Sequence, residues 1–319
     1  MEILVYGAGA LGSLVGGLLA RSHEVTLVGR DPHMQQIRED GLRIDGEVDA
    51  HVHPRALTDG THRSADLAVV TTKAYDTDAA ARALATGTYE AVCSLQNGVT
   101  EERLVAALNP TVLAGTASYG AQFAEPGRVT CTGLGEVAVG RLSGGDDPLA
   151  ERVGSAFNEA GIETVVAADM PRRRYTKLAV NAGINGPSAL AGLPNGATID
   201  GPGGEAAREA VREVARVARA DGVALDEAAA VAAVERVAAD TAANRSSMRA
   251  DVAAGRRTEV DAIYGVAVDR ADRFGVSAPT CRTLASLIRA WEVGAEIRPE
   301  AEVGAEIRPE AEVGETSEE

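Results

Sequence analysis

Residues 2–12 read EILVYGAGALG, and this stretch decides the fold of the N-terminal half. The short apolar run Glu2–Tyr6 favours a buried strand, and the apolar residues after Gly9 favour a helix. Between them lies the pattern GxGxxG. Its first glycine permits a tight turn, its second lets a pyrophosphate approach the backbone, and its third lets helix and strand pack closely. The stretch therefore predicts a dinucleotide-binding turn made of Gly7, Ala8, Gly9, Ala10, Leu11 and Gly12.

The following residues alternate between strand and helix patterns, which is typical of a parallel sheet covered by helices. Apolar runs that favour buried strands occur at residues 24–28, 66–71, 91–95 and 111–117. Residues 129–132 and 136–139 flank Gly133 and Gly135, and we expect them to form a hairpin of antiparallel edge strands. The fold class predicted is α/β, with a Rossmann-type parallel-sheet domain over residues 1–168.

A second domain is expected because the chain has 319 residues, of which 45% are hydrophobic. From about Pro148 the strand signal fades, and Ala-rich helical patterns occur at 205–220, 226–243 and 258–274. Pro187, Pro194 and the glycines at 201–204 are expected to interrupt them. We predict an all-helical substrate domain over residues 169–291.

The C-terminus carries a tandem repeat. Residues 292–301 read EVGAEIRPEA, residues 302–311 repeat them letter for letter, and a third copy begins at Glu312. Residues 292–319 hold ten glutamates and two arginines, a composition that favours disorder. We predict a disordered acidic tail over 292–319; a partner-binding role for it is the less favoured alternative.

The formal net charge is −16 and the pI is near 4.8, so a nucleic-acid partner is not expected. The only lysines are Lys73 and Lys177, whereas arginine is abundant. Strong acidity with scarce lysine is typical of a salt-loving organism, although a GC-rich genome also replaces lysine with arginine. In either case the surface does not use lysine, so we expect Lys73 and Lys177 to have specific roles.

The cysteine pattern and the lack of a long apolar run bear on the compartment and on metal binding. The three cysteines, Cys93, Cys131 and Cys281, lie far apart and give neither a metal-binding spacing nor a disulfide framework. The first strand begins at once, and no apolar run is long enough to cross a bilayer. We expect a cytoplasmic protein without a membrane segment or a metal; a homodimer is compatible with the sequence.

Cofactor choice depends on the end of the second strand. An acidic residue usually binds the ribose 2′-hydroxyl of NAD there, but this chain has Gly29 followed by Arg30. Arginine pairs with a 2′-phosphate, so NADPH is favoured; NADH stays open because Asp31 is next. At later strand ends, Lys73 is expected to contact cofactor or substrate. Asn97 is expected to point into the cleft, where it would contact cofactor and substrate, or to cap a helix.

Lys177, Asn181 and Asn185 are spaced four residues apart, so they share one face of a helix. A polar stripe on an otherwise apolar helix suits a cleft. Burial there lowers the pKa of a lysine, which can then donate a proton near neutral pH, as arginine cannot. The stripe predicts Lys177 as a general acid.

Two later segments add candidate ligands. Asn244 and Ser247 share a face and could hold a carboxylate, or could simply cap a helix. Thr258 resembles an N-cap with Asp261 three residues on, which places Glu259 in the first helical turn. Glu259 there is either a fixed negative partner for a lysine or substrate hydroxyl, or a surface residue.

Taken together, these motifs resemble the ketopantoate reductase family over roughly residues 1–290. The resemblance rests on the glycine-rich turn, Thr72-Lys73-Ala74, Gln96-Asn97-Gly98, Lys177-Leu178-Ala179-Val180-Asn181 with Ile184-Asn185, Pro194-Asn195-Gly196, Asn244-Arg245-Ser246-Ser247-Met248 and Thr258-Glu259-Val260-Asp261. It implies NADPH-dependent reduction of 2-dehydropantoate to (R)-pantoate, on the way to pantothenate and coenzyme A.

The resemblance also implies roles for single residues. Lys177 would protonate the developing alkoxide, and Glu259 would orient Lys177 and bind the substrate hydroxyl. Ser247 would bind the substrate carboxylate. The side chains expected to line the substrate site are Asn97, Asn181, Asn185, Asn195 and Asn244. Two alternatives remain. One is a reductase of another small 2-keto acid. The other is a non-catalytic NADP sensor, which is less favoured because a sensor would need neither Lys177 nor Glu259.

Overall fold

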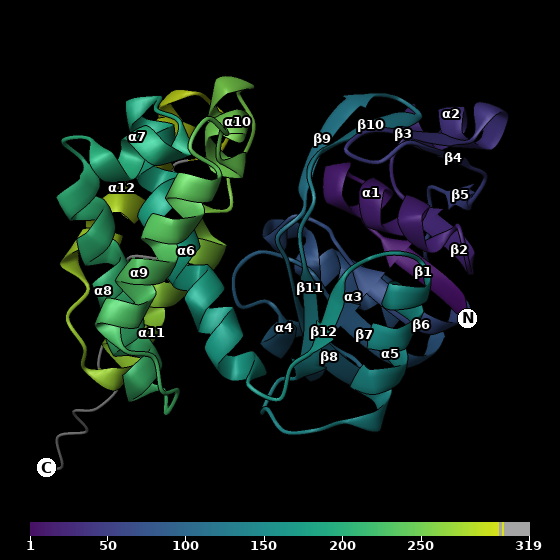
Figure 1. Cartoon of the computed structure of the whole chain (residues 1–319), viewed down its shortest axis with the longest axis horizontal. Coiled ribbons are helices and arrows are strands. Elements are labelled where there is room, and N and C mark those ends of the chain that lie inside the picture. The colour runs from purple at the N-terminus through teal and green to yellow at the C-terminus, as the bar shows by residue number, and fades with distance from the viewer. Residues whose placement is uncertain (300–301, 303–319) are drawn as a thin grey trace, which may run out of the picture.

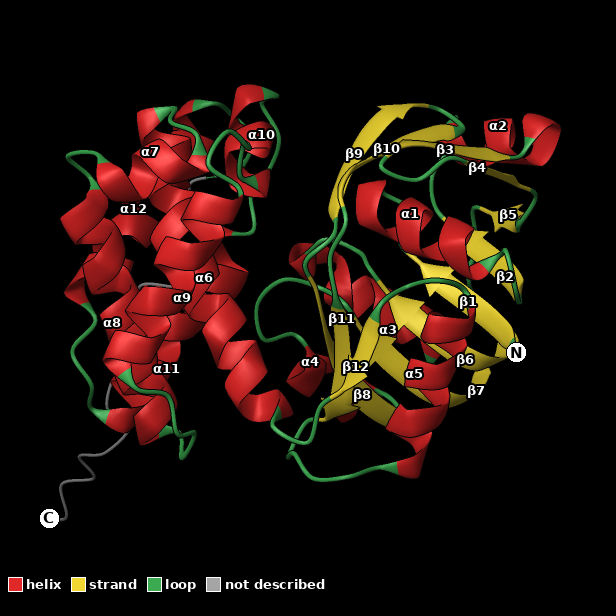
Figure 2. Ribbon diagram, viewed as in Figure 1, coloured by secondary structure: helices red, strands yellow, loops and turns green. Residues whose placement is uncertain are grey.

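The computed structural model describes residues 1–299 and residue 302, and it arranges them as a sheet domain beside a helical domain (Figures 1 and 2). Within these residues the main sheet has the strand order β12-β11-β8-β7-β6-β1-β2-β5. Its strands are β1 Glu2–Tyr6, β2 Glu24–Val28, β5 Arg55–Leu57, β6 Ser64–Val70, β7 Thr88–Ser94, β8 Thr111–Ala117, β11 Val137–Arg141 and β12 Thr164–Val166. Every neighbouring pair is parallel except β11 with β8. The Rossmann-type parallel sheet is confirmed.

Helices cover both faces of this sheet because successive side chains of a strand point to opposite sides. On one face, Ile3 and Val5 share a core with α1 (Ala10–Leu19) and α5 (Pro148–Glu159). On the other, Leu4 shares a core with α3 (Thr77–Leu84) and α4 (Glu101–Ala107). The remaining elements are α2 His33–Asp40 and the short 3₁₀ turn η1 Ala74–Asp76.

The predicted hairpin around Gly133 and Gly135 is wrong. Its first half, β10 (Arg128–Gly133), pairs with β9 (Gly120–Glu125) and β3 (Leu42–Gly46) in a separate small sheet that is completed by β4 (Ala50–Val52). Its second half, β11, joins the main sheet beside β8. The small sheet buries Ile44 and Val129 in the core under α1, and this burial of apolar surface stabilises the first half in its observed place.

The helical domain is confirmed for the residues that the structure describes beyond Asp169. Its elements are α6 Met170–Ala191, α7 Asn195–Asp200, α8 Gly204–Ala220, α9 Glu227–Asp240, α10 Ser247–Ala253, the π-helical turn η2 Asp261–Gly265, α11 Val266–Phe274 and α12 Pro279–Gly294. The long helix α6 lies at the centre of the domain and faces the sheet domain with its N-terminal half (Figure 1).

Pro187 does not interrupt a helix as expected, because α6 continues through it to Ala191. A proline lacks the N–H of the helical ladder and disturbs the turn before it. Here the hydroxyl of Tyr264 fills the disturbed turn: it accepts from the N–H of Gly186 at 2.9 Å and donates to the oxygen of Ala182 at 2.6 Å. A Cβ at Gly186 would lie 2.4 Å from that hydroxyl oxygen, so glycine is required there.

The prediction of disorder from residue 292 onward is wrong for residues 292–299. Glu292 and Arg298 are buried, with side-chain exposures of 0% each, and they form an ion pair of 2.8 Å. The prediction of disorder used only the number of charged residues in this segment. It could not show that two of them, of opposite charge, are buried as an ion pair. The rest of the predicted tail, apart from Glu302, lies outside the described residues.

Candidate active site

A cavity of about 830 Å³ lies where the carboxyl ends of the parallel strands face the helical domain. This is the edge at which open α/β sheets bind ligands. The sheet domain lines the cavity with the glycine-rich turn and the ends of β2, β6, β7 and β8. The helical domain contributes Lys177, Asn181, Ser247 and Glu259. Its volume is in the range of small-molecule and cofactor sites.

The glycine-rich turn has the geometry that its sequence predicts. Gly7 has φ +110°, and a Cβ there would lie 2.5 Å from the backbone nitrogen of Thr72. A Cβ at Gly12 would lie 2.2 Å from the oxygen of Gly7, so α1 packs against β1 at a distance that only glycine allows. The turn, from Gly7 to Leu11, lines the cavity, and α1 begins at Ala10 with free N–H groups. A phosphate fits such a helix N-terminus.

Arg30 lies at the adenosine end expected for such a site. Its side chain is 88% exposed, lines the cavity and touches Asp76 at 3.2 Å. The neighbouring Asp31 is paired with Arg38 at 3.1 Å. Both residues are thus ion-paired, but the side chain of Arg30 is more exposed than that of Asp31, 88% against 51%, so its guanidinium stays accessible to an anion.

Helix α6 carries the predicted proton donor to the cavity. The ammonium of Lys177 donates to the backbone oxygen of Ala117 at 3.1 Å. Burial lowers the pKa of Lys177 to about 8, although the negative charges of Glu259 and Glu101 act in the opposite direction. One turn later, the buried amide nitrogen of Asn181 has no hydrogen-bond partner among the described residues. An unpaired buried donor is costly, so a ligand that accepts from it gains correspondingly.

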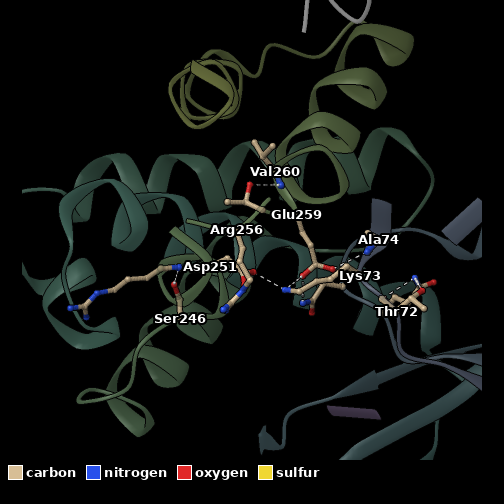
Figure 3. A network of polar contacts seen from close by, with 12 residues as sticks. Thr72, Lys73, Ala74, Ser246, Asp251, Arg256, Glu259 and Val260 are labelled. Atoms are coloured by element: carbon tan, nitrogen blue, oxygen red, sulfur yellow. Dashed lines mark hydrogen bonds and ion pairs between the residues drawn. The ribbon is translucent and has the colours of Figure 1, made fainter. Parts of the chain in front are cut away.

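Glu259 reaches across to the sheet domain (Figure 3). Its carboxylate accepts from the N–H of Ala74 at 3.1 Å, from the amide of Asn97 at 3.0 Å and from the ammonium of Lys73 at 3.3 Å. Glu259 is 6% exposed and makes no hydrogen bond or ion pair with Lys177 in the described structure, so it acts on Lys177 through its charge.

Lys73 is held by two carboxylates at once, those of Asp251 at 2.7 Å and Glu259 at 3.3 Å (Figure 3). Burial opposes its charge, but the two carboxylates outweigh burial and raise the pKa of Lys73. The two lysines of the chain thus differ: the pKa of Lys73 is raised, so it stays cationic, whereas the pKa of Lys177 is lowered to about 8.

Three predicted substrate residues do not line the cavity in the described structure. Asn185 is buried within α6, Asn195 donates to the hydroxyl of Thr241 at 3.0 Å, and Asn244 is exposed and accepts at its backbone oxygen from Asn195. Their role as substrate ligands stays a prediction. Near Asn244, Ser247 lines the cavity and Ser246 caps α10.

One expectation about the segment around Glu259 needs correction, and one residue beside Lys73 was missed. The capping box of Thr258 and Asp261 is wrong, because Asp261 binds Arg289 and Arg298 instead. Sequence reasoning also missed Asp251, the closer partner of Lys73. Its signal was its position: Asp251 follows Ser247 by four residues and so lies on the same face of α10.

Among residues 1–299 and 302, no helix combines the length and apolarity of a membrane span. The same residues contain no cluster of three histidine, cysteine or acidic side chains arranged to hold a metal ion.

Comparison with known proteins gives concordant matches. The family model for ketopantoate reductase PanE/ApbA matches residues 3–144, and the model for its C-terminal domain matches residues 169–292. A 2-dehydropantoate 2-reductase of Halobacterium salinarum is 44% identical over 299 residues, which is 91% of this chain and 98% of that protein. One of Archaeoglobus fulgidus is 36% identical over 295 residues, 92% of this chain and 98% of that protein. The Halobacterium match agrees with a salt-adapted composition.

Solved structures agree with this. A PanE/ApbA family ketopantoate reductase from Ralstonia eutropha has a TM-score of 0.85 and 33% identity, covering 93% of this chain and all of that one. A ternary structure of D-mandelate dehydrogenase with NADH and anilino(oxo)acetate has a TM-score of 0.87 and 25% identity, with coverages of 93% and 100%. Because family models match both domains and relatives span nearly the whole chain, this protein belongs to the ketopantoate reductase family.

Proposed function

We propose that this protein reduces 2-dehydropantoate to (R)-pantoate with NADPH, and so supplies pantothenate and coenzyme A synthesis. The curated relatives named above carry this activity in their names. The observation that carries the proposal is the position of Lys177: a lysine with a pKa of about 8, in a cavity lined by a dinucleotide-type turn.

The glycine-rich turn and Arg30 are the groups proposed to hold the cofactor. Backbone N–H groups at the start of α1 suit the pyrophosphate, and the exposed guanidinium of Arg30 suits a 2′-phosphate. A bound nicotinamide supplies the hydride. NADPH is favoured over NADH because Asp31 is engaged by Arg38; the D-mandelate dehydrogenase structures hold NADH, so NADH remains the second candidate.

The residues of the helical domain are proposed to manage the substrate and its proton. As hydride reaches the keto carbon, charge develops on the oxygen, and the ammonium of Lys177 donates the proton. Asn181 offers its unpaired amide to the substrate, and Ser247 offers a hydroxyl to the substrate carboxylate. Glu259 keeps a negative charge near Lys177, accepts from the substrate hydroxyl, and with Asn97 and Lys73 joins the two domains.

The test is oxidation of NADPH and NADH by the purified protein with 2-dehydropantoate, at low and high salt. Ketopantoate-dependent oxidation that is faster with NADPH supports both parts of the proposal. A reductase of another 2-keto acid is the second candidate, because D-mandelate dehydrogenase shares the fold. It would give oxidation with an aromatic or other 2-keto acid and little with ketopantoate. Cofactor binding without oxidation of any keto acid would indicate a sensor. A cytoplasmic homodimer stays a prediction, which light scattering and fractionation would check.

A further inference from the structure

We propose that the first copy of the C-terminal repeat is part of the active-site framework: Glu292 and Arg298 are positioning residues that hold the segment bearing Glu259. This inference rests on the proposed function of Glu259. It assigns a role to Arg298, which lies beyond the family match that ends at residue 292, and to a repeat whose composition alone favours disorder.

The segment in question needs external support. Residues 256–259 belong to no helix or strand, and the π-helical turn η2 starts only at Asp261. Yet Glu259 must meet three groups of the sheet domain at once, Lys73, Ala74 and Asn97. A side chain with such fixed partners works only if its own backbone is fixed as well.

Glu292 fixes the residue immediately before Glu259. One oxygen of its carboxylate accepts from both the backbone N–H and the hydroxyl of Thr258, each at 2.7 Å. The hydroxyl of Thr258 in turn accepts from the N–H of Val260 at 3.3 Å. Thr258 is 1% exposed and Glu292 is 0% exposed, so water does not compete for these contacts.

Arg298 links the two sides of the segment. Its guanidinium pairs with Glu292 at 2.8 Å and also contacts the carboxylate of Asp261, two residues after Glu259. Arg289 of α12 binds the same carboxylate at 2.8 Å. Burial opposes ionisation of Asp261, but Arg298 and Arg289 outweigh it and lower the pKa of Asp261. Glu259 therefore projects from a stretch clamped on both sides by the repeat and the helix before it.

The chain folds back to make this clamp. After α12 ends at Gly294, the N–H groups of Ile297 and Arg298 both donate to the backbone oxygen of Glu292, at 2.9 and 3.2 Å. Glu296 adopts a positive φ of 57° within this reversal. Burying the guanidinium of Arg298 and the carboxylate of Glu292 costs desolvation free energy, so we infer that this pair specifies one arrangement of the segment rather than adding stability. The arrangement specified here is the position of Glu259.

The repeat supplies a matched control. Arg308 occupies in the second copy the place that Arg298 occupies in the first, within the same sequence EIRPE. The same substitution at the two positions changes the same composition and charge. We therefore compare Arg298→Met with Arg308→Met in the full-length chain.

The first readout is steady-state reduction of 2-dehydropantoate by NADPH across pH. Arg298→Met is expected to lower kcat/KM by about 10- to 100-fold, the size of effect that displacing a positioned group has. In the pH profile of kcat/KM for this variant, the fall at high pH, its alkaline limb, is expected to begin at a lower pH. The reason is that a displaced Glu259 no longer raises the pKa of Lys177. NADPH affinity, measured by fluorescence, should stay unchanged, and Arg308→Met should match the wild type in all three quantities.

The second readout needs no substrate, so it separates this inference from the proposed activity. Amide hydrogen exchange over residues 256–265 should rise in Arg298→Met and not in Arg308→Met. If the wild type fails to reduce ketopantoate while this difference holds, the function is wrong and the clamp stands. If Arg298→Met keeps the wild-type exchange, kcat/KM and alkaline limb, or if Arg308→Met loses as much, the clamp is wrong.

If Arg298→Met does not fold, the inference is tested with Arg298→Lys instead. Lysine keeps the positive charge but lacks the planar guanidinium that contacts two carboxylates. We expect a folded protein with intermediate kcat/KM, an alkaline limb shifted in the same direction, and higher exchange over 256–265. Wild-type values of all three in Arg298→Lys would overturn the inference.

Discussion

The ammonium of Lys73 and the carboxylate of Asp251 lie 2.7 Å apart across the boundary between the two domains, although 178 residues separate them along the chain. Lys73 follows a strand of the sheet domain, and Asp251 belongs to α10 of the helical domain. With Glu259 at 3.3 Å from the same ammonium, this bridge holds the two walls of the cavity together.

Removing the bridge should impair the reaction more than removing an ordinary surface ion pair. We expect Lys73→Met to lower kcat/KM about tenfold, which corresponds to ~1.4 kcal/mol. Arg152→Met is the control, because Arg152 pairs with Glu90 at 2.9 Å within the sheet domain and both side chains are more than half exposed. Equal activity of the two variants would show that the bridge contributes nothing to catalysis.

The pH dependence of the reaction should report Lys177. Its protonated form donates the proton, and this form is present below a pKa of about 8 and lost as the pH rises through it. Reduction should therefore slow above pH 8, and oxidation of pantoate, which needs the neutral amine as a base, should speed up over the same range. Profiles of kcat/KM in both directions check this. A limb near 10.5, the ordinary value for lysine, would mean that another group carries the proton.

Arg30 should decide between the two nicotinamide cofactors. In Arg30→Ala the KM for NADPH is expected to rise about 10- to 100-fold, since hydrogen bonds to charged groups contribute roughly 1.5–3 kcal/mol. The KM for NADH, which lacks the 2′-phosphate, should hardly change and serves as the internal control. A parallel rise for both cofactors would argue against a phosphate contact.

The hydroxyl of Tyr264 should stabilise the helical domain through α6. Tyr264→Phe leaves the oxygen of Ala182 and the N–H of Gly186 unpaired, and we expect a loss of ~1–3 kcal/mol in the free energy of unfolding. Tyr89→Phe is the matched control, because its buried hydroxyl has no hydrogen-bond partner among the described residues. Urea unfolding of both variants measures the difference; equal losses would contradict the bridging role.

The sequence predicts most of what depends on local pattern. The strand at Glu2–Tyr6, the glycine-rich turn, and Lys177 with Asn181 on one face of α6 follow from spacing and occur in the structure, whereas Asn185 on the same face lies outside the cavity. Lys177 is conspicuous because lysine is rare in this chain and because the three residues that follow it, Leu178 to Val180, are apolar.

What the sequence does not predict depends on contacts between distant segments. β10 leaves its expected hairpin because β3, far back in the chain, offers it a partner. Pro187 is accommodated because Tyr264 fills the disturbed turn. Glu292 is buried because it meets Thr258, and Arg298 because it meets Asp261, both far back in the chain. No pattern within a single segment encodes such pairings.

The role of Lys177 in ketopantoate reduction is tested most directly by measuring ketopantoate-dependent NADPH oxidation in the wild type and in Lys177→Ala side by side, with NADPH affinity measured for both. We predict that the wild type turns over, and that Lys177→Ala binds NADPH with unchanged affinity but loses at least ~100-fold in kcat. Near-normal turnover in Lys177→Ala would remove Lys177 from the mechanism, and a wild type inactive on ketopantoate at low and high salt would contradict the proposed reaction itself.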